Sequence, residues 1–214
     1  MHDDISIFHR RGTSARQLVL LFHGADATSS ALHAVGSAVA RRFEQAWVLS
    51  APAPDAPDGG GAARQPFSVG DGDDVYRAAR VAQAMPAFAR IVRHWQREAG
   101  VGAAATTLIG FSQGAVIVLE STQRAERLAG RVVAIAGRFA KVPRLAPIGT
   151  TLHLMHGLGD RVMPSRLGVD AVERLHALGA SVTLDLFPSL AHEIDERVLE
   201  RVVLRLQGPA AIVP

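Results

Sequence analysis

Continuous apolar runs alternate with amphipathic segments along this chain, and that alternation predicts its elements. An apolar run such as Leu18-Val19-Leu20-Leu21-Phe22 is typical of a strand buried on both faces, as in a parallel sheet covered by helices. An alternating segment at the start of the chain predicts an additional strand at the sheet edge. The predicted strands span residues 5–8, 17–22, 46–49, 106–109, 131–136, 150–156 and 182–187.

Helical patterns fill most of the intervals between these strands. Ser29 or Ser30 can cap the first helix, and two aspartates place negative charge at the start of the second. Pro86 interrupts the second helix and predicts a kink or a break into two pieces. The predicted helices span residues 31–43, 73–99, 113–122, 165–178 and 195–206.

Strands that alternate with helices over the whole length indicate an α/β fold, with a mainly parallel central sheet and helices on both faces. We expect residues 1–214 to form a single domain, because no insertion is long enough to make a separate cap. Residues 50–72 form a long irregular segment rich in proline and glycine. Such a segment is either functional, here as an acyl-binding wall that contains Phe67, or a flexible surface loop.

The segment Gly110-Phe111-Ser112-Gln113-Gly114 lies where a strand passes sharply into a helix. A turn this tight brings backbone against backbone, so a Cβ at either glycine is expected to collide with its neighbours. The motif predicts a nucleophile elbow with the Ser112 hydroxyl at its tip. On its own it is weak evidence, because a short Gly-x-Ser-x-Gly match also occurs by chance.

A serine nucleophile needs a histidine base and a carboxylate that orients the base. Enzymes with this elbow place nucleophile, acid and histidine in that order along the chain. Asp160 and His192 follow Ser112 in that order, each in a loop after a predicted strand. Two simpler interpretations remain: Asp160 as a helix cap and His192 as an exposed loop residue.

Other aspartates compete with Asp160 on residue type alone. Asp170 falls within a predicted helix and Asp185 within a predicted strand. Asp195 lies at a helix start, where capping is the expected role. Position along the chain therefore favours Asp160 as the acid.

The oxyanion of the tetrahedral intermediate requires backbone N–H donors. In this arrangement they come from the residue after the nucleophile, Gln113, and from the loop after the first buried strand. In that loop His23-Gly24 precedes Ala25, which makes Ala25 the expected second donor. Phe67 and Met163 are expected to line the substrate pocket.

Composition excludes several other classes of protein. The chain has no cysteine, which rules out disulfides and thiolate chemistry and is consistent with a cytoplasmic protein. There is no HExxH spacing, and we expect neither a metal nor another cofactor.

Basic residues are almost all arginine, Lys141 being the only lysine, and they are spread out rather than clustered as in a nucleic-acid binder. We find no secretory signal and no apolar run long enough to span a membrane.

The motifs in combination resemble the phospholipase/carboxylesterase family of α/β-hydrolases, which also contains the acyl-protein thioesterases. The resemblance extends over nearly the whole chain and rests on five segments: His23-Gly24, the proline-rich residues 51–67, the Ser112 pentapeptide, residues 156–164 and Ala191-His192. Residues 64–69 and 93–96 are most similar to small bacterial cytosolic esterases in that family. The resemblance implies Ser112, Asp160 and His192 as the triad, with Ala25 and Gln113 as oxyanion donors.

Three positions depart from the usual family pattern. Ala191 stands before the histidine in place of glycine, Ala25-Asp26-Ala27 replaces larger residues, and Pro66 stands where an aromatic residue is common. We expect a serine carboxylesterase that acts on small or short-acyl esters, as a monomer or homodimer. The alternatives are a thioesterase or lysophospholipase with the same triad, and a non-catalytic binding protein of the same fold.

Overall fold

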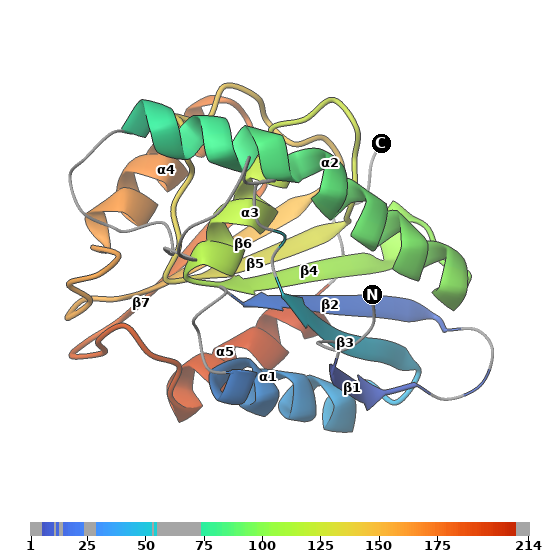
Figure 1. The fold of residues 1–214 in the computed structure, drawn as a ribbon. Helices are drawn as coiled ribbons and strands as arrows, with labels where there is room; N and C mark the ends of the chain where they lie inside the picture. The colour runs from blue at the N-terminus through green and yellow to red at the C-terminus, as the bar shows by residue number, and fades with distance from the viewer. Residues whose placement is uncertain are drawn as a thin grey trace, which may run out of the picture.

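A computed structural model describes residues 6–10, 12, 15–23, 29–52, 54 and 74–208 (Figure 1). Its centre is a seven-stranded sheet with the order β1-β3-β2-β4-β5-β6-β7. Each strand predicted from the apolar pattern is present, with ends that differ by a few residues. The strands are β1 (Ser6–His9), β2 (Gln17–His23), β3 (Ala46–Pro52), β4 (Thr106–Phe111), β5 (Arg131–Ile135), β6 (Thr151–Gly157) and β7 (Val182–Phe187).

The sheet is parallel except at one edge. β1 pairs antiparallel with β3, whereas every other neighbouring pair is parallel. All residues of β4 and β5 are buried, including Thr106, Thr107 and Arg131 at their starts, as expected for strands inside a covered sheet. The α/β-hydrolase fold expected from the motifs is therefore confirmed, and the loops that follow β4, β6 and β7 share one edge of the sheet.

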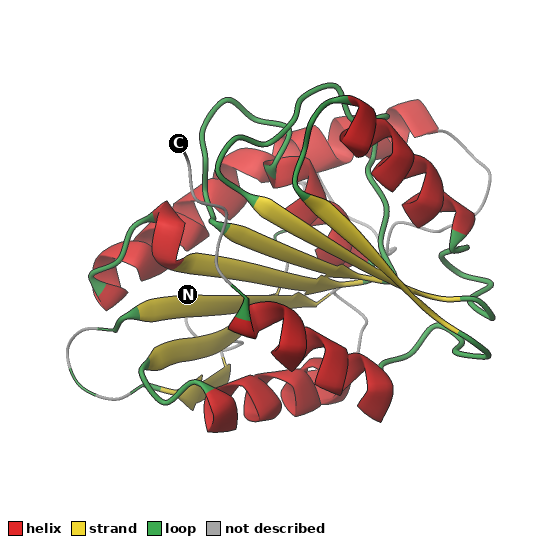
Figure 2. Ribbon diagram, turned by 180° about the vertical axis from the view of Figure 1, so that it is seen from behind, coloured by secondary structure: helices red, strands yellow, loops and turns green. Residues whose placement is uncertain are grey.

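Helices cover both faces of the sheet (Figures 1 and 2). α2 (Asp74–Ala99), α3 (Gln113–Ser121) and α4 (Arg166–Ala177) lie on one face. α1 (Ser29–Arg42) and α5 (Glu196–Gln207) lie on the other. A short 3-10 helix, η1 (Ala103–Ala105), precedes β4. The largest fully buried side chains are those of Trp47, Phe22 and Phe88, and the last two rings pack at 4.7 Å between centroids.

Of the kink or break predicted at Pro86, the break does not occur, because α2 continues through this residue as one helix. Pro86 removes one backbone N–H donor. Packing of the apolar face of α2 compensates for that loss, since Ala84, Met85 and Phe88 are all buried in the core around it.

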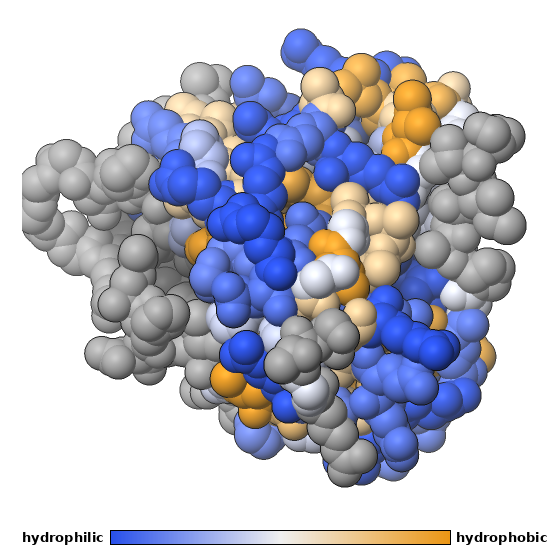
Figure 3. Space-filling view, turned by 90° about the vertical axis from the view of Figure 1, so that its right-hand side faces the viewer, coloured by the Kyte–Doolittle hydropathy of each residue, from blue (hydrophilic) through white to orange (hydrophobic). Residues whose placement is uncertain are grey.

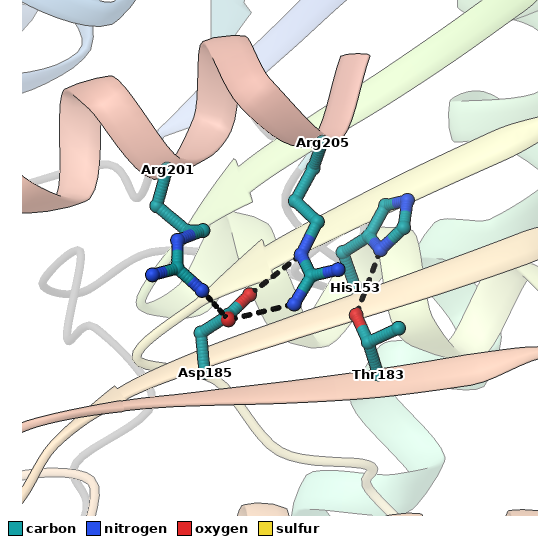
Figure 4. A network of polar contacts seen from close by, with 5 residues as sticks. All are labelled: His153, Thr183, Asp185, Arg201 and Arg205. Atoms are coloured by element: carbon teal, nitrogen blue, oxygen red, sulfur yellow. Dashed lines mark hydrogen bonds and ion pairs between the residues drawn. The ribbon is translucent and has the colours of Figure 1, made fainter. Parts of the chain in front are cut away.

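An ion-pair cluster fastens α5 to the sheet (Figure 4). The buried carboxylate of Asp185 on β7 accepts hydrogen bonds from Arg205 Nε at 2.9 Å and Arg205 Nη2 at 2.7 Å, and it also accepts one from Arg201. The hydrogen bonds to Asp185 raise the pKa of Arg205. The cluster therefore joins the last strand of the sheet to the last helix.

Figure 3 shows the side of the molecule where the parallel strands begin, opposite the edge that contains Ser112. The described surface there is mostly hydrophilic, with small groups of hydrophobic residues between charged ones. Among the described residues, no helix is both long and apolar enough to cross a membrane.

Candidate functional site

Ser112 lies at the tip of the turn between β4 and α3, with φ = 54° and ψ = −117°. Neighbouring backbone makes this turn possible only with glycine at two positions. A Cβ on Gly114 would lie 1.9 Å from the carbonyl oxygen of Phe22, and a Cβ on Gly110 would lie 2.4 Å from that of Gly114. The predicted elbow is thus present in the backbone, and the end of β2 packs directly beneath it.

Residues with strained backbone conformations cluster at the edge of the sheet that contains Ser112. Among the described residues, three non-glycine residues have positive φ: Ser112 at 54°, Ala136 at 48° and Ser189 at 60°. They lie one or two residues after the ends of β4, β5 and β7 respectively. Such conformations cost of order 1–3 kcal/mol each and tend to occur where a site imposes them. Their position favours a functional site at this edge.

Asp160 lies in the turn after β6, and its side chain is fully buried. Its Oδ1 accepts hydrogen bonds from the backbone N–H groups of Val162 and Met163, both at 2.8 Å. Its Oδ2 lies 2.8 Å from His192 Nδ1. The two amides fix the carboxylate in the one orientation that points Oδ2 at the imidazole.

His192 joins the other two side chains. Its Nε2 lies 2.9 Å from Ser112 Oγ, and its ring packs against that of Phe111 with centroids 5.0 Å apart. A carboxylate only accepts hydrogen bonds, so Nδ1 carries a proton that it donates to Asp160, and Nε2 accepts from the Ser112 hydroxyl. The imidazole remains 19% exposed, whereas Asp160 is inaccessible. This arrangement can move a proton from Ser112 Oγ to His192 Nε2.

The turn that contains Asp160 and the loop that contains His192 are joined backbone to backbone. Gly159 N–H donates to the carbonyl oxygen of Leu190 at 2.9 Å, and Leu158 N–H donates to that of Phe187 at 2.9 Å. A Cβ on Gly157 would lie 2.2 Å from the Leu190 oxygen, so this close approach requires glycine. The relative position of Asp160 and His192 is therefore set by main-chain contacts.

The far end of the His192 loop is held by side chains. Asp195 caps α5 by accepting a hydrogen bond from Val198 N–H at 3.1 Å, which is the role its position predicts. Arg197 donates to Asp195 at 2.7 Å and to the carbonyl oxygen of Pro188 at 3.1 Å. Arg197 therefore connects the two ends of the loop around His192.

These contacts distinguish the surroundings of the four aspartates considered. Ser165, not Asp160, occupies the cap position of α4, so Asp160 does not cap that helix. Asp170 lies within α4, and Asp185 lies in β7, bonded to arginines. Of the four aspartates considered, Asp160 alone contacts His192.

Two of the remaining predicted site residues lie in the described part of the chain, and two lie outside it. Gln113 is the first residue of α3 and is buried, and the first N–H groups of a helix have no intrahelical acceptor. Met163 is also buried, and its backbone contacts Asp160. Ala25 and Phe67 lie outside the described residues, so their roles stay predictions.

Sequence reasoning missed several supports of this site. Four contacts of the site residues had no recognisable signal in the sequence: those of the Val162 amide, the Met163 amide, the Leu190 carbonyl and the Phe111 ring. The first three use main-chain atoms, which every residue possesses. The buried His156, three residues before Gly159, was also passed over. Within the described part of the chain, no three His, Asp or Glu side chains converge as metal ligands would. The absence of a cofactor stays a prediction.

Comparisons with known proteins agree with the motifs. The model of the phospholipase/carboxylesterase family matches residues 4–207. Esterase YpfH of Escherichia coli (strain K12) is 45% identical over 186 residues, which cover 87% of this chain and 80% of that protein.

Solved structures share the fold over nearly the whole chain. The crystal structure of esterase PE8 superposes with a TM-score of 0.79 at 25% identity, covering 95% of this chain and 97% of that one. The Bacillus cereus carboxylesterase superposes with a TM-score of 0.74 at 16% identity, covering 95% and 92% of the two chains, which is a likeness of fold alone.

Proposed function

Since the chain belongs to the phospholipase/carboxylesterase family, we propose that it is a serine carboxylesterase with Ser112 as nucleophile, His192 as base and Asp160 as the orienting acid. Esterase activity is supported by the similarity to the Escherichia coli esterase YpfH. The observation that carries the mechanism is the hydrogen-bonded row Ser112–His192–Asp160, with spacings of 2.9 and 2.8 Å.

Acylation begins when Ser112 Oγ attacks the carbonyl carbon of the ester and its proton passes to His192 Nε2. Asp160, held by two backbone amides, stabilises the imidazolium and keeps its orientation. When the tetrahedral intermediate collapses, the C–O bond of the ester breaks and His192 gives the proton to the departing alcohol. The acyl group remains on Ser112.

Deacylation repeats these steps with water. His192 Nε2 takes a proton from the water molecule, whose oxygen attacks the acyl carbon. The second tetrahedral intermediate collapses, the proton returns to Ser112 Oγ, and the carboxylic acid leaves. Because His192 keeps 19% of its side chain exposed, its position is compatible with access for water beside Ser112.

The oxyanion of each intermediate is proposed to bind the N–H of Gln113, at the positive end of the α3 dipole. The N–H of Ala25 is proposed as the second donor. Loss of one such donor costs about 10²–10³-fold in kcat. The proposed substrates are small or short-acyl esters, and Met163 and Phe67 are proposed to line the pocket.

The test is turnover of p-nitrophenyl esters of increasing acyl length, combined with labelling by a fluorophosphonate probe. The wild-type protein is expected to hydrolyse the short esters and to be labelled at Ser112, identified by mass spectrometry of the labelled peptide. Ser112→Ala is expected to lose labelling and at least about 10³-fold in kcat while keeping its unfolding temperature.

A matched control is Ser121→Ala, which removes a buried serine hydroxyl at the other end of α3. Ser121 Oγ donates only to the backbone oxygen of Val118, so its loss is expected to lower stability slightly and leave turnover intact. Near-normal turnover in Ser112→Ala, or label on another residue, would overturn the proposal.

A further inference from the structure

His156 is a buried histidine that the proposed mechanism does not use. It is the second-to-last residue of β6, four residues before Asp160, and only 1% of its surface is exposed. A group this inaccessible cannot touch the ester or the reacting atoms. Any effect of His156 on catalysis must therefore act through its neighbours.

The imidazole of His156 occupies the space between β6 and α4. A Cβ on Gly168 of α4 would lie 2.5 Å from His156 Cδ2 and 2.6 Å from His156 Nε2. The helix thus packs against one side of the ring at a position where no side chain would fit. α4 begins at Arg166, after the turn that contains Asp160, so the ring lies against the first turn of the helix that follows Asp160.

Two backbone carbonyls from different loops also face this ring. Those of Met163, in the Asp160 turn, and Gly137, in the loop after β5, favour the protonated imidazole, as does the charge of Asp160, whereas His192 disfavours it. Burial outweighs them and lowers the pKa of His156, so the ring is neutral at neutral pH. Neither ring nitrogen has an acceptor or donor in full hydrogen-bond geometry among the described residues.

A leucine or phenylalanine would fill the same volume without burying polar nitrogens, whose incomplete hydrogen bonding costs about 1–3 kcal/mol. Packing alone therefore does not account for a histidine here. What the imidazole adds is polarity directed at the carbonyls of two loops. One of these loops supplies both amides that hold Asp160.

We propose that His156 is a positioning residue: its imidazole, held between Gly168 and the loops at Gly137 and Met163, maintains the turn whose amides aim Asp160 at His192. The Met163 backbone acts on the His156 ring, its N–H donates to Asp160 Oδ1, and Asp160 Oδ2 lies 2.8 Å from His192 Nδ1. The inference rests on the proposed function, since it assigns His156 to the orientation of the proposed acid.

The test compares His156→Leu with His156→Gln, using p-nitrophenyl acetate and active sites counted with the fluorophosphonate probe. A displaced Asp160 leaves His192 misaligned, so His156→Leu is expected to lower kcat per active site by about 10- to 100-fold with KM within about twofold. His156→Gln keeps an N–H donor and is expected to recover at least part of that loss. If kcat per site in His156→Leu is within about twofold of wild type, the proposal fails.

Gly168→Ala changes the contact between Gly168 and the His156 ring from the α4 side. Because it keeps His156, it remains informative even if the histidine variants fail to fold. Its matched control is Gly36→Ala in α1, where a Cβ would lie 2.5 Å from the ring of Phe8, at the other edge of the sheet. Both changes add an alanine to a helix and crowd an aromatic ring.

Gly168→Ala is expected to lower kcat at least about threefold, and Gly36→Ala to leave it unchanged. Equal kcat values in the two alanine variants would overturn the inference. Absence of turnover and labelling in the wild-type protein would instead refute the esterase proposal, so the two failures are distinguishable.

Discussion

The two faces of β6 each bury a histidine, and the two histidines have different surroundings. His153 points to the face covered by α5, where its Nδ1 lies 2.8 Å from Thr183 Oγ1, beside the cluster of Asp185, Arg201 and Arg205 (Figure 4). His156, three residues later, points to the face covered by α4 and has no such side-chain partner among the described residues. Both have lowered pKa values because burial disfavours the imidazolium.

The contacts on one face of β6 contribute to the stability of the fold, whereas those on the other face lead to the proposed catalytic residues. On the α5 face, ionic side chains join β7 to α5 without contacting Ser112, Asp160 or His192. On the α4 face, the contacts lead through backbone amides to Asp160. We therefore expect substitutions on the α5 face to change the free energy of unfolding, and those on the α4 side to change kcat.

The largest expected effect is that of Asp160→Asn. The amide oxygen of asparagine can still accept hydrogen bonds from Val162 and Met163, so the turn is retained. Its NH₂ group cannot accept the Nδ1 proton of His192, which favours the wrong tautomer and is expected to lower kcat about 10⁴-fold. The measurement is kcat together with the unfolding temperature. A kcat within tenfold of wild type would show that Asp160 is not the acid.

Asp185→Asn is the counterpart on the α5 face. It leaves Arg205 and Arg201 without their carboxylate, and because both arginines are partly exposed we expect a loss of about 2–3 kcal/mol in the free energy of unfolding. Urea unfolding measures this loss, and kcat per active site is expected to remain within twofold. A fall in kcat comparable to that of Asp160→Asn would contradict the separation of the two faces.

The smallest effect concerns pH. Burial, together with the charges of Arg131 and Arg205, lowers the pKa of His153 to about 4 from 6.5. Between these values the unfolded chain binds a proton that the folded protein does not, so stability falls as pH decreases from 6.5 towards 4. The expected contribution is about 2 kcal/mol between pH 6.5 and about pH 5.

The measurement for His153 is urea unfolding at several pH values in wild type and in His153→Asn, which removes the titrating ring. The variant is expected to show a shallower loss of stability over this range, whatever its stability at neutral pH. Equal slopes in the two proteins would show that His153 does not titrate with a lowered pKa.

Apolar patterns and glycine spacing were sufficient to predict the sheet, the elbow and three side chains that lie within hydrogen-bond distance of one another, whose catalytic roles stay predictions. Runs such as that of β2 have one stable placement, inside a covered sheet, and the elbow at Ser112 has a backbone that only glycine at its flanks permits. Asp160 and His192 could be chosen because both follow strands. These features depend on residues that are close together in the chain, so the sequence alone is enough to predict them.

What the sequence did not predict depends on contacts between distant segments. The continuity of α2 through Pro86 reflects packing by residues from other elements, which outweighs a local preference. The bonds from Gly159 to Leu190 and from Met163 to Asp160 use main-chain groups that every residue possesses. The role of His156 follows from its contact with Gly168, a residue on a separate helix.

Holding Asp160 by amides has a consequence for engineering the enzyme. The orientation of the carboxylate depends on the backbone at Val162 and Met163 and not on the identity of those side chains. Leu158 and Val162, in the same turn, are 55% and 40% exposed. A library that randomises these two exposed positions, with proline excluded, changes the surface of the turn while preserving the bonds to Asp160. Selection for new ester preferences is best begun at this turn.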